Sequence, residues 1–168
     1  DTDAAVLFAE ALMVLRPWDY WRSDGRPQPG TEEIVSTLEA ALQHHPDHPG
    51  ACHYYIHAVE ASQEPQRGLP CAKRLPSLMP GAGHLVHMPA HIYMRMGLYR
   101  EASERNAQAA TVDHEYLLHP PLEGNYASGY YAHNLHFLNA SLVMEGRSAE
   151  ALQAARDLLS KISVDEIV

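Results

Sequence analysis

The sequence predicts an all-α protein, an α-solenoid in which about eight helices form repeating antiparallel pairs. Segments rich in helix-forming residues alternate with short stretches of proline and glycine, and the apolar–polar alternation typical of strands is almost absent. The pattern H-x-x-x-H at His53 and His57 recurs at His87 and His91, an offset of 34 residues. Self-similarity near this period is typical of repeating helix pairs.

The first helix is predicted at Ala4–Leu15, whose alanine, leucine and methionine favour a helix that ends before Pro17. The next segment, 16–30, holds three prolines and two glycines, so we expect an ordered loop there. Its expected anchors are the aromatic residues Trp18, Tyr20 and Trp21. A second helix is expected at Thr31–His44, because threonine followed by two glutamates favours a helix start.

The other predicted helices lie at 50–62, 66–78, 84–96, 98–112, 126–145 and 148–161. Pro89 lacks a backbone donor and should kink its helix or move the start of that helix toward Met88. The chain length suits a single domain over 1–168. Its helix pairs are expected at about 1–46, 50–80, 84–113 and 126–161, with loop insertions at about 16–30 and 114–125.

Small residues stand five positions after three of the inter-helix turns, where they let paired helices approach: Gly68, Ala102 and Ala151. With the turn "GLYREA", this pattern resembles the tetratricopeptide repeat (TPR) over about 31–161. The strings "HYYIHAVEAS" and "GHLVHMPAHIYMRMG" resemble a group of bacterial TPR proteins with histidines in their first helices. The resemblance implies a bacterial origin and a concave groove lined by the first helices, and it implies no activity.

Histidines on these first helices lie about 100° around the helix from the apolar stripe that packs on neighbouring helices. Nine equivalent positions on this face hold seven histidines, whereas chance placement of 12 histidines in 168 residues (9 × 12/168) gives about 0.6. The seven are His53, His57, His84, His87, His91, His133 and His136. We therefore expect them to converge in the groove.

Histidines at i and i+4 place both rings on one face of a helix, which suits a shared metal ion. We predict a metal site with His53, His57, His87 and His91 at its core and the other three histidines as remaining or second ligands. Glu60 is predicted as an oxygen ligand or a catalytic base. The donor set suits zinc, copper, iron or nickel and does not choose among them.

The groove is also expected to bind a small molecule or peptide, so a metalloenzyme is one interpretation. Its expected wall residues are Tyr54, Met88, Arg95 and Phe137. Two alternatives stay open: a metal-free TPR scaffold for a protein or peptide partner, and a purely structural role for the histidines. The insertion at 114–125 is interpreted either as a lid over one end of the groove or as a plain surface connection.

Charge and composition exclude some partners. The formal net charge of −9 is the wrong sign for a nucleic-acid surface, and no apolar run is long enough to span a bilayer. We expect a soluble protein, with the cytoplasm slightly favoured. Because the chain starts at Asp1 inside a predicted helix, it is interpreted as a processed or truncated piece of a longer one. Cys52 and Cys71 are expected to be buried free thiols.

Overall fold

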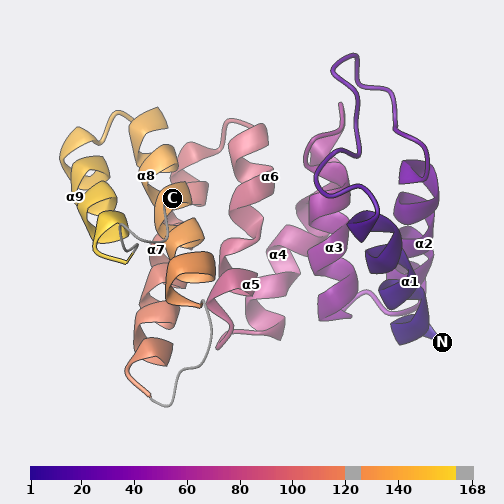
Figure 1. Ribbon diagram of the computed structural model, residues 1–168, viewed down its shortest axis with the longest axis horizontal. Helices are drawn as coiled ribbons and strands as arrows, with labels where there is room; N and C mark the ends of the chain where they lie inside the picture. The colour runs from indigo at the N-terminus through magenta and orange to yellow at the C-terminus, as the bar shows by residue number, and fades with distance from the viewer. Residues whose placement is uncertain (120–125, 162–168) are drawn as a thin grey trace.

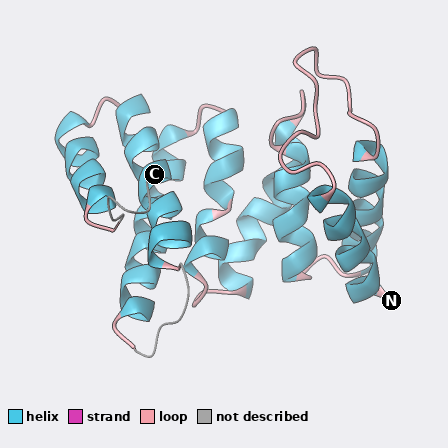
Figure 2. Ribbon diagram, viewed as in Figure 1, coloured by secondary structure: helices cyan, strands magenta, loops and turns pink. Residues whose placement is uncertain are grey.

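The computed structural model describes residues 1–119 and 126–161, in which α-helices dominate and only one isolated bridge, Trp21 to Pro27, has strand-like pairing (Figures 1 and 2). The α-helices are α1 (Thr2–Val14), α2 (Thr31–His44), α3 (Pro49–Val59), α4 (Leu69–Leu78), α5 (Gly83–His87), α6 (Pro89–Arg95), α7 (Tyr99–Leu117), α8 (Ala132–Met144) and α9 (Ser148–Leu159). Two short segments, η1 (Pro65–Gly68) and the π-helical η2 (Ala127–Tyr131), precede α4 and α8. With α5 and α6 counted as one broken helix, the described chain has eight α-helices, as predicted.

Successive helices pack on one another along the chain. Helix α2 contacts α1 and α3, α4 contacts α3 and α6, and α7 contacts α5, α6 and α8. Figure 1 shows this order as a progression from α1 and α2 at one end to α9 at the other. Helices α3 and α6 also touch directly, so the helices that carry His57 and His91 are neighbours, as predicted.

Local sequence explains the start of α3, the first histidine-bearing helix. Pro49 occupies the first turn, where a missing backbone donor is harmless. The residue before it, His48, caps the helix, because its Nδ1 accepts a hydrogen bond from the Ala51 backbone at 3.1 Å. His48 therefore has a structural role at the start of α3.

Pro89 divides the second histidine-bearing segment as predicted. Helix α5 ends at His87, Met88 is a turn residue, and Pro89 opens α6. Met88 lies in the core with no exposed surface, so its predicted place on the groove wall is wrong. Its backbone stays helical, with φ −48° and ψ −35°, so its side chain lies one turn before Ile92 on the buried face.

Helix α5 lies very close to α7, and Gly83 makes this approach possible. A Cβ atom on Gly83 would fall 1.8 Å from Oδ1 of Asp113, which is buried on α7. The Asp113 carboxylate accepts hydrogen bonds from Tyr126 at 2.7 Å and from Asn134 at 2.5 Å. One buried acid thus ties η2 and α8 to α7 and fixes the position of His133, which neighbours Asn134.

The loop 16–30 folds against α3. The indole Nε1 of Trp21 donates a hydrogen bond to the backbone carbonyl of Ala58 at 2.7 Å, and Tyr20 is buried in the core. Trp18 instead leaves 69% of its surface exposed and has a positive φ of 63°. The expected ordered loop is confirmed, with Tyr20 as a buried anchor and Trp21 as a partly buried one.

Two boundaries differ from the sequence prediction. Helix α7 continues to Leu117, so the first residues of the predicted insertion 114–125 are helical because no proline or glycine stops them. Residues 120–125, on which the lid interpretation depends, lie outside the described part of the chain. Cys52 and Cys71 are buried and free, as expected. No described helix has the length and apolar character needed to cross a bilayer.

Candidate metal centre

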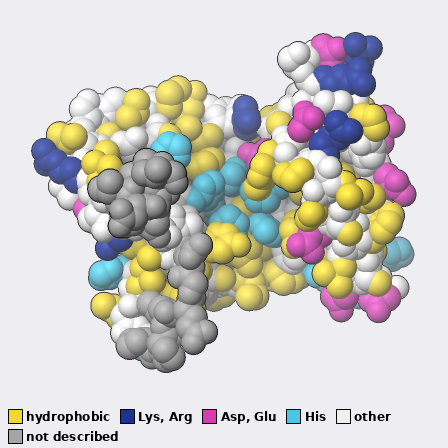
Figure 3. All heavy atoms as spheres, in the orientation of Figure 1, with side chains coloured by type: hydrophobic (Ala, Val, Ile, Leu, Met, Phe, Trp, Pro, Cys, Tyr) yellow, Lys and Arg dark blue, Asp and Glu magenta, His cyan; other side chains and the backbone are white. Residues whose placement is uncertain are grey.

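Six of the seven predicted histidines meet in one cluster built by four helices. The six are His53 and His57 from α3, His84 and His87 from α5, His91 from α6 and His133 from α8. Histidine side chains gather in a hollow at the middle of the face seen in Figure 3, with apolar side chains around them. The cluster is mostly enclosed, because His57, His87 and His91 are buried.

The Nε2 atoms in this cluster lie within a few ångströms of one another. Nε2 of His87 is 2.9 Å from Nε2 of His91 and 3.1 Å from Nε2 of His133. Nε2 of His53 is 3.2 Å from Nε2 of His84. Two imidazoles that share a metal at bond lengths of about 2.0–2.1 Å have nitrogens about 2.9–3.4 Å apart at ordinary ligand angles. The observed separations fall in that range.

Glu60 orients two of these rings through their other nitrogen. Its carboxylate oxygens lie 2.9 Å from Nδ1 of His57 and 2.7 Å from Nδ1 of His91. A carboxylate can only accept, so each ring donates an Nδ1 proton and leaves an unprotonated Nε2. Burial alone would raise the pKa of Glu60, but the hydrogen bonds from His57 and His91 outweigh it and hold the pKa at about 2. Glu60 therefore stays anionic.

Asn106 orients a third ring from α7. Its Oδ1 lies 2.6 Å from Nδ1 of His87, and both residues are fully buried. The amide oxygen accepts the Nδ1 proton, so Nε2 of His87 also carries a lone pair. Hydrogen bonding of the second ring nitrogen to carboxylates or amides is how proteins fix the tautomer of metal-binding histidines.

These proton positions leave lone pairs facing each other. Nε2 of His87 and Nε2 of His91 stand 2.9 Å apart, and both rings have committed their Nδ1 protons elsewhere. A cation between the two nitrogens would remove the repulsion. Burial and the neighbouring His91 and His133 lower the pKa of His87 well below its usual value, so the His87 ring stays neutral and able to coordinate. A metal ion between the two nitrogens is one such cation.

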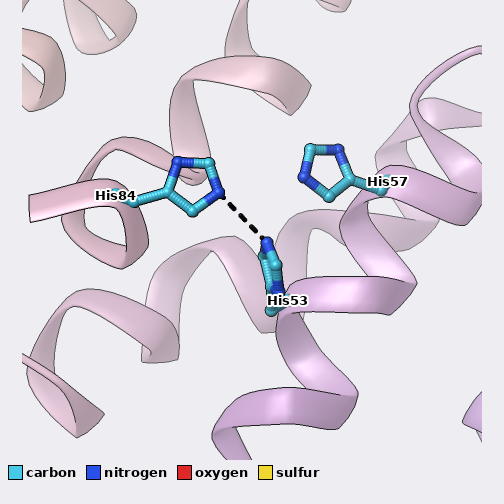
Figure 4. Close-up of side chains that lie close together, drawn as sticks. All are labelled: His53, His57 and His84. Atoms are coloured by element: carbon cyan, nitrogen blue, oxygen red, sulfur yellow. Dashed lines mark hydrogen bonds between the residues drawn. The ribbon is translucent and has the colours of Figure 1, made fainter. Parts of the chain in front are cut away.

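Three sets of donors are compact enough to bind one ion, since all their ligand atoms lie within 4.8 Å of one another. They are His53, His57 and His84; His84, His87 and His133; and His57, Glu60 and His91. Figure 4 shows the first set, with one nitrogen of each ring directed toward a common centre. The first two sets share His84, whose Nδ1 is buried without a hydrogen-bond partner among the described residues.

Five histidines of the cluster, His53, His57, His84, His87 and His133, have lowered pKa values, which suits metal coordination. Burial is the largest cause of the lowered pKa values, which fall to about 3 for His53, about 2 for His84 and about 4 for His133. Repulsion from neighbouring imidazoles lowers them further. Imidazole must be neutral to coordinate a metal, so this environment prepares the ligands without a proton to displace.

The remaining predicted site residues lie around the cluster. Phe137 packs against it, with ring centroids 4.8, 4.5 and 4.9 Å from those of His87, His91 and His133. His136, the seventh histidine, is exposed on α8 and joins none of the compact donor sets. It lines a small cavity of about 280 Å³ together with Arg95, Glu60 and His91.

A larger cavity of about 790 Å³ adjoins the opposite side of the cluster. Four histidines of the cluster line this cavity: His53, His57, His84 and His133. The first three form one of the compact donor sets. The predicted wall residue Tyr54 lies there, with its ring 4.9 Å from that of His53. The same cavity is also lined by Trp18, Tyr130 and Glu10. The volume falls in the range of small-molecule sites, about 300–1,000 Å³.

Sequence reasoning missed the polar residues that hold the histidines in place. Asn106 lies on the same face of α7 as Ala102 and Ala109, three and four positions away, and all three are fully buried. A polar amide among small buried residues was the signal that could have identified it. Asp113, seven positions further along α7, could have been found by the same criterion.

No protein-family model matches this chain, and no curated protein matches it in sequence. The class of protein is therefore defined by the structure alone: an α-helical protein with buried histidine clusters that could hold a metal ion.

Proposed function

We propose that this protein is a TPR-like α-solenoid whose histidine cluster binds a transition metal, and that it acts as a metalloenzyme on a small molecule held in the adjoining cavity. The order of helix packing and the contact between α3 and α6 support the solenoid assignment. The resemblance to bacterial TPR proteins with histidine-rich first helices supports the same proposal.

One observation carries the metal assignment. Nε2 of His87 and Nε2 of His91 face each other at 2.9 Å while Asn106 and Glu60 take the protons of their Nδ1 atoms. Hydrophobic packing does not require this arrangement, and buried lone pairs in contact are unfavourable without a cation. Imidazole donors suit zinc, copper, iron and nickel.

The residues around the cluster indicate what the protein itself contributes. Glu60 and Asn106 hold their ring partners through Nδ1, and such outer contacts orient the ligands and raise their basicity. Both Glu60 oxygens are engaged by histidines, so the carboxylate serves as a positioning group in this proposal and not as a base. A bound ion would polarise a substrate oxygen or activate a water molecule.

Elemental analysis tests this proposal directly. The chain should be purified without a histidine tag or chelator, supplied in turn with zinc, copper, iron and nickel, and freed of loose metal by gel filtration. We expect at least one of the four ions to remain bound in a fixed ratio to protein. The donor set His84, His87 and His133 shares no residue with the set His57, Glu60 and His91, so these two sets allow two ions per chain. If none of the four is retained, the metal-free scaffold becomes the better interpretation.

A further inference from the structure

Each histidine of the donor set His53, His57 and His84 has an aromatic side chain against it. The ring centroid of Tyr54 is 4.9 Å from that of His53, that of Trp18 is 4.9 Å from that of His57, and that of Tyr130 is 4.8 Å from that of His84. All three aromatic residues line the large cavity. We call Trp18, Tyr54 and Tyr130 the aromatic collar.

The collar is only partly covered by protein. Trp18 and Tyr130 leave 69% and 51% of their surface exposed. Trp18 also has a φ of 63°, a conformation that is costly for a bulky residue and that tends to occur at functional sites. Trp18 therefore has a strained backbone conformation, and its ring packs against His57 and lines the cavity.

A single carboxylate completes the wall of the cavity. Glu10 of α1 lines it, is partly buried, and has no basic partner within ion-pair distance among the described residues. Burial and the neighbouring Glu10 carboxylate raise the pKa of Tyr54 to about 12, which places this acid beside the collar. The described lining residues include no lysine or arginine. Glu10 would therefore repel an anionic ligand, and no lysine or arginine among the described lining residues would offset this repulsion.

We propose that the large cavity binds an organic ammonium compound with an apolar body, its cationic end held by the aromatic collar and Glu10 and its other end directed at the histidines. Aromatic faces attract organic cations through their quadrupole, and a nearby carboxylate adds a favourable charge. Assigning this ligand as a substrate depends on the proposed function, whereas its binding does not.

Two probes of equal shape separate charge recognition from simple burial. Benzyltrimethylammonium carries a cationic head, and neopentylbenzene replaces its nitrogen with carbon. Binding of each to the full chain should be measured by calorimetry or by ligand-detected NMR, with benzenesulfonate as an anionic third probe. We expect the cation to bind about tenfold more tightly than the neutral compound and the sulfonate to bind least.

Variants locate the source of this preference. Glu10→Gln should reduce the preference for the cation from about tenfold to about threefold, because the charge of Glu10 is lost while the aromatic collar still attracts the cation. Glu32→Gln removes an exposed acid from the first turn of α2 and should leave the preference unchanged. Trp18→Ala should weaken both the cation and its neutral analogue.

Equal binding of the cation and the neutral compound to the wild-type chain would overturn the proposal. So would a tenfold preference that survives Glu10→Gln in a variant with wild-type helix content. Metal analysis of the same samples keeps the two proposals apart. Cation preference without bound metal refutes only the metal centre, and bound metal without cation preference refutes only the ammonium site.

Discussion

Nδ1 of His87 lies 2.6 Å from Oδ1 of Asn106, and neither residue has any exposed surface. This hydrogen bond joins α5 to α7 and directs the remaining lone pair of His87 toward His91 and His133. A residue that touches no proposed metal position therefore controls the direction in which a central ligand faces.

Asn106→Ala should weaken metal affinity by about 10- to 100-fold without removing a ligand. Without its acceptor, His87 can rotate or move its proton to Nε2. Competition titration against a chelator of known affinity measures the change. Asn106→Asp, which keeps an acceptor at the same place, should retain most of the affinity.

A matched control for this prediction is Asn139→Ala on α8. Asn139 is a partly buried asparagine whose amide donates to the backbone carbonyl of Ala151, on the side of α8 away from the cluster. Its loss should leave metal affinity unchanged. Equal affinity of Asn106→Ala and wild-type protein would show that Asn106 does not position His87.

Glu60→Gln should also lower metal affinity by about 10- to 100-fold. A neutral amide offers one acceptor oxygen and two donors, so it can accept the Nδ1 proton of only one of His57 and His91. The other ring must change tautomer or turn away. Chelator competition again measures affinity, and Glu64→Gln at an exposed position nearby is the control. Unchanged metal binding in Glu60→Gln would contradict the orienting role.

The sequence predicted the all-α class and the helices well, because helices and their ends depend on local signals. Thr31–His44 matches α2 at both ends, and Pro89 divides its helix as expected. The helix face that the histidines occupy could also be predicted locally, because the spacing of residues along a helix determines the face on which they lie. Six of seven predicted ligands consequently meet, although His136 is left outside the compact sets.

Other parts of the site depend on contacts between distant segments, which local patterns do not contain. Asn106 reaches His87 across 19 residues, and Trp18 reaches His57 from a loop whose path depends on tertiary packing. The second contact of Glu60 has the same origin. Its position one turn beyond His57 predicted a ligand, and it belongs to a compact donor set, but the approach of His91 from α6 to its second oxygen was not predicted. Met88 was misplaced because it lies one turn before Ile92, on the face that is buried in the core.

Gly83→Ala should destabilise the fold by about 1–3 kcal/mol, since small-to-large changes in a packed interior force neighbours to shift. The added Cβ would fall 1.8 Å from Oδ1 of Asp113, whose carboxylate is fixed by Tyr126 and Asn134. Urea unfolding followed by circular dichroism measures the change. Gly81→Ala, where a Cβ would meet no atom within 4 Å, should have a much smaller effect.

The metal-free protein should lose stability as the pH falls from about 6.5 toward 4. In the unfolded chain the histidines titrate near 6.5. In the fold, burial lowers the pKa to about 3 for His53, about 2 for His84 and about 4 for His133. Between these values the unfolded state binds more protons, so acid favours unfolding. Urea unfolding of the chelated protein at a series of pH values measures this slope.

The same pKa values predict how metal binding depends on pH. Free imidazole would lose metal below about pH 6.5. His53, His84 and His133 are already neutral there, so the affinity of folded protein should hold until the pH approaches about 4, the value for His133. Metal content after gel filtration at pH 7, 6 and 5 measures this. A loss centred at 6.5 while the helices remain intact would show that the cluster is more hydrated than its burial indicates.

Replacing His57 and His91 together by alanine should abolish metal binding. The two rings lie 4.8 Å apart, come from neighbouring helices and share the Glu60 carboxylate, so their removal takes His57 from one donor set, takes both histidines from another and leaves Glu60 unpaired. A metal that binds only the folded chain stabilises it by about 2.7 kcal/mol at a hundredfold excess over its dissociation constant. Chelator should therefore lower the melting temperature of the wild-type protein and leave that of the double variant unchanged. Replacing the exposed His44 and His45 together is the control and should preserve both the metal and the chelator effect. Full metal content in the His57 and His91 double variant would show that neither donor set with His57 holds the ion and would leave His84, His87 and His133 as its site.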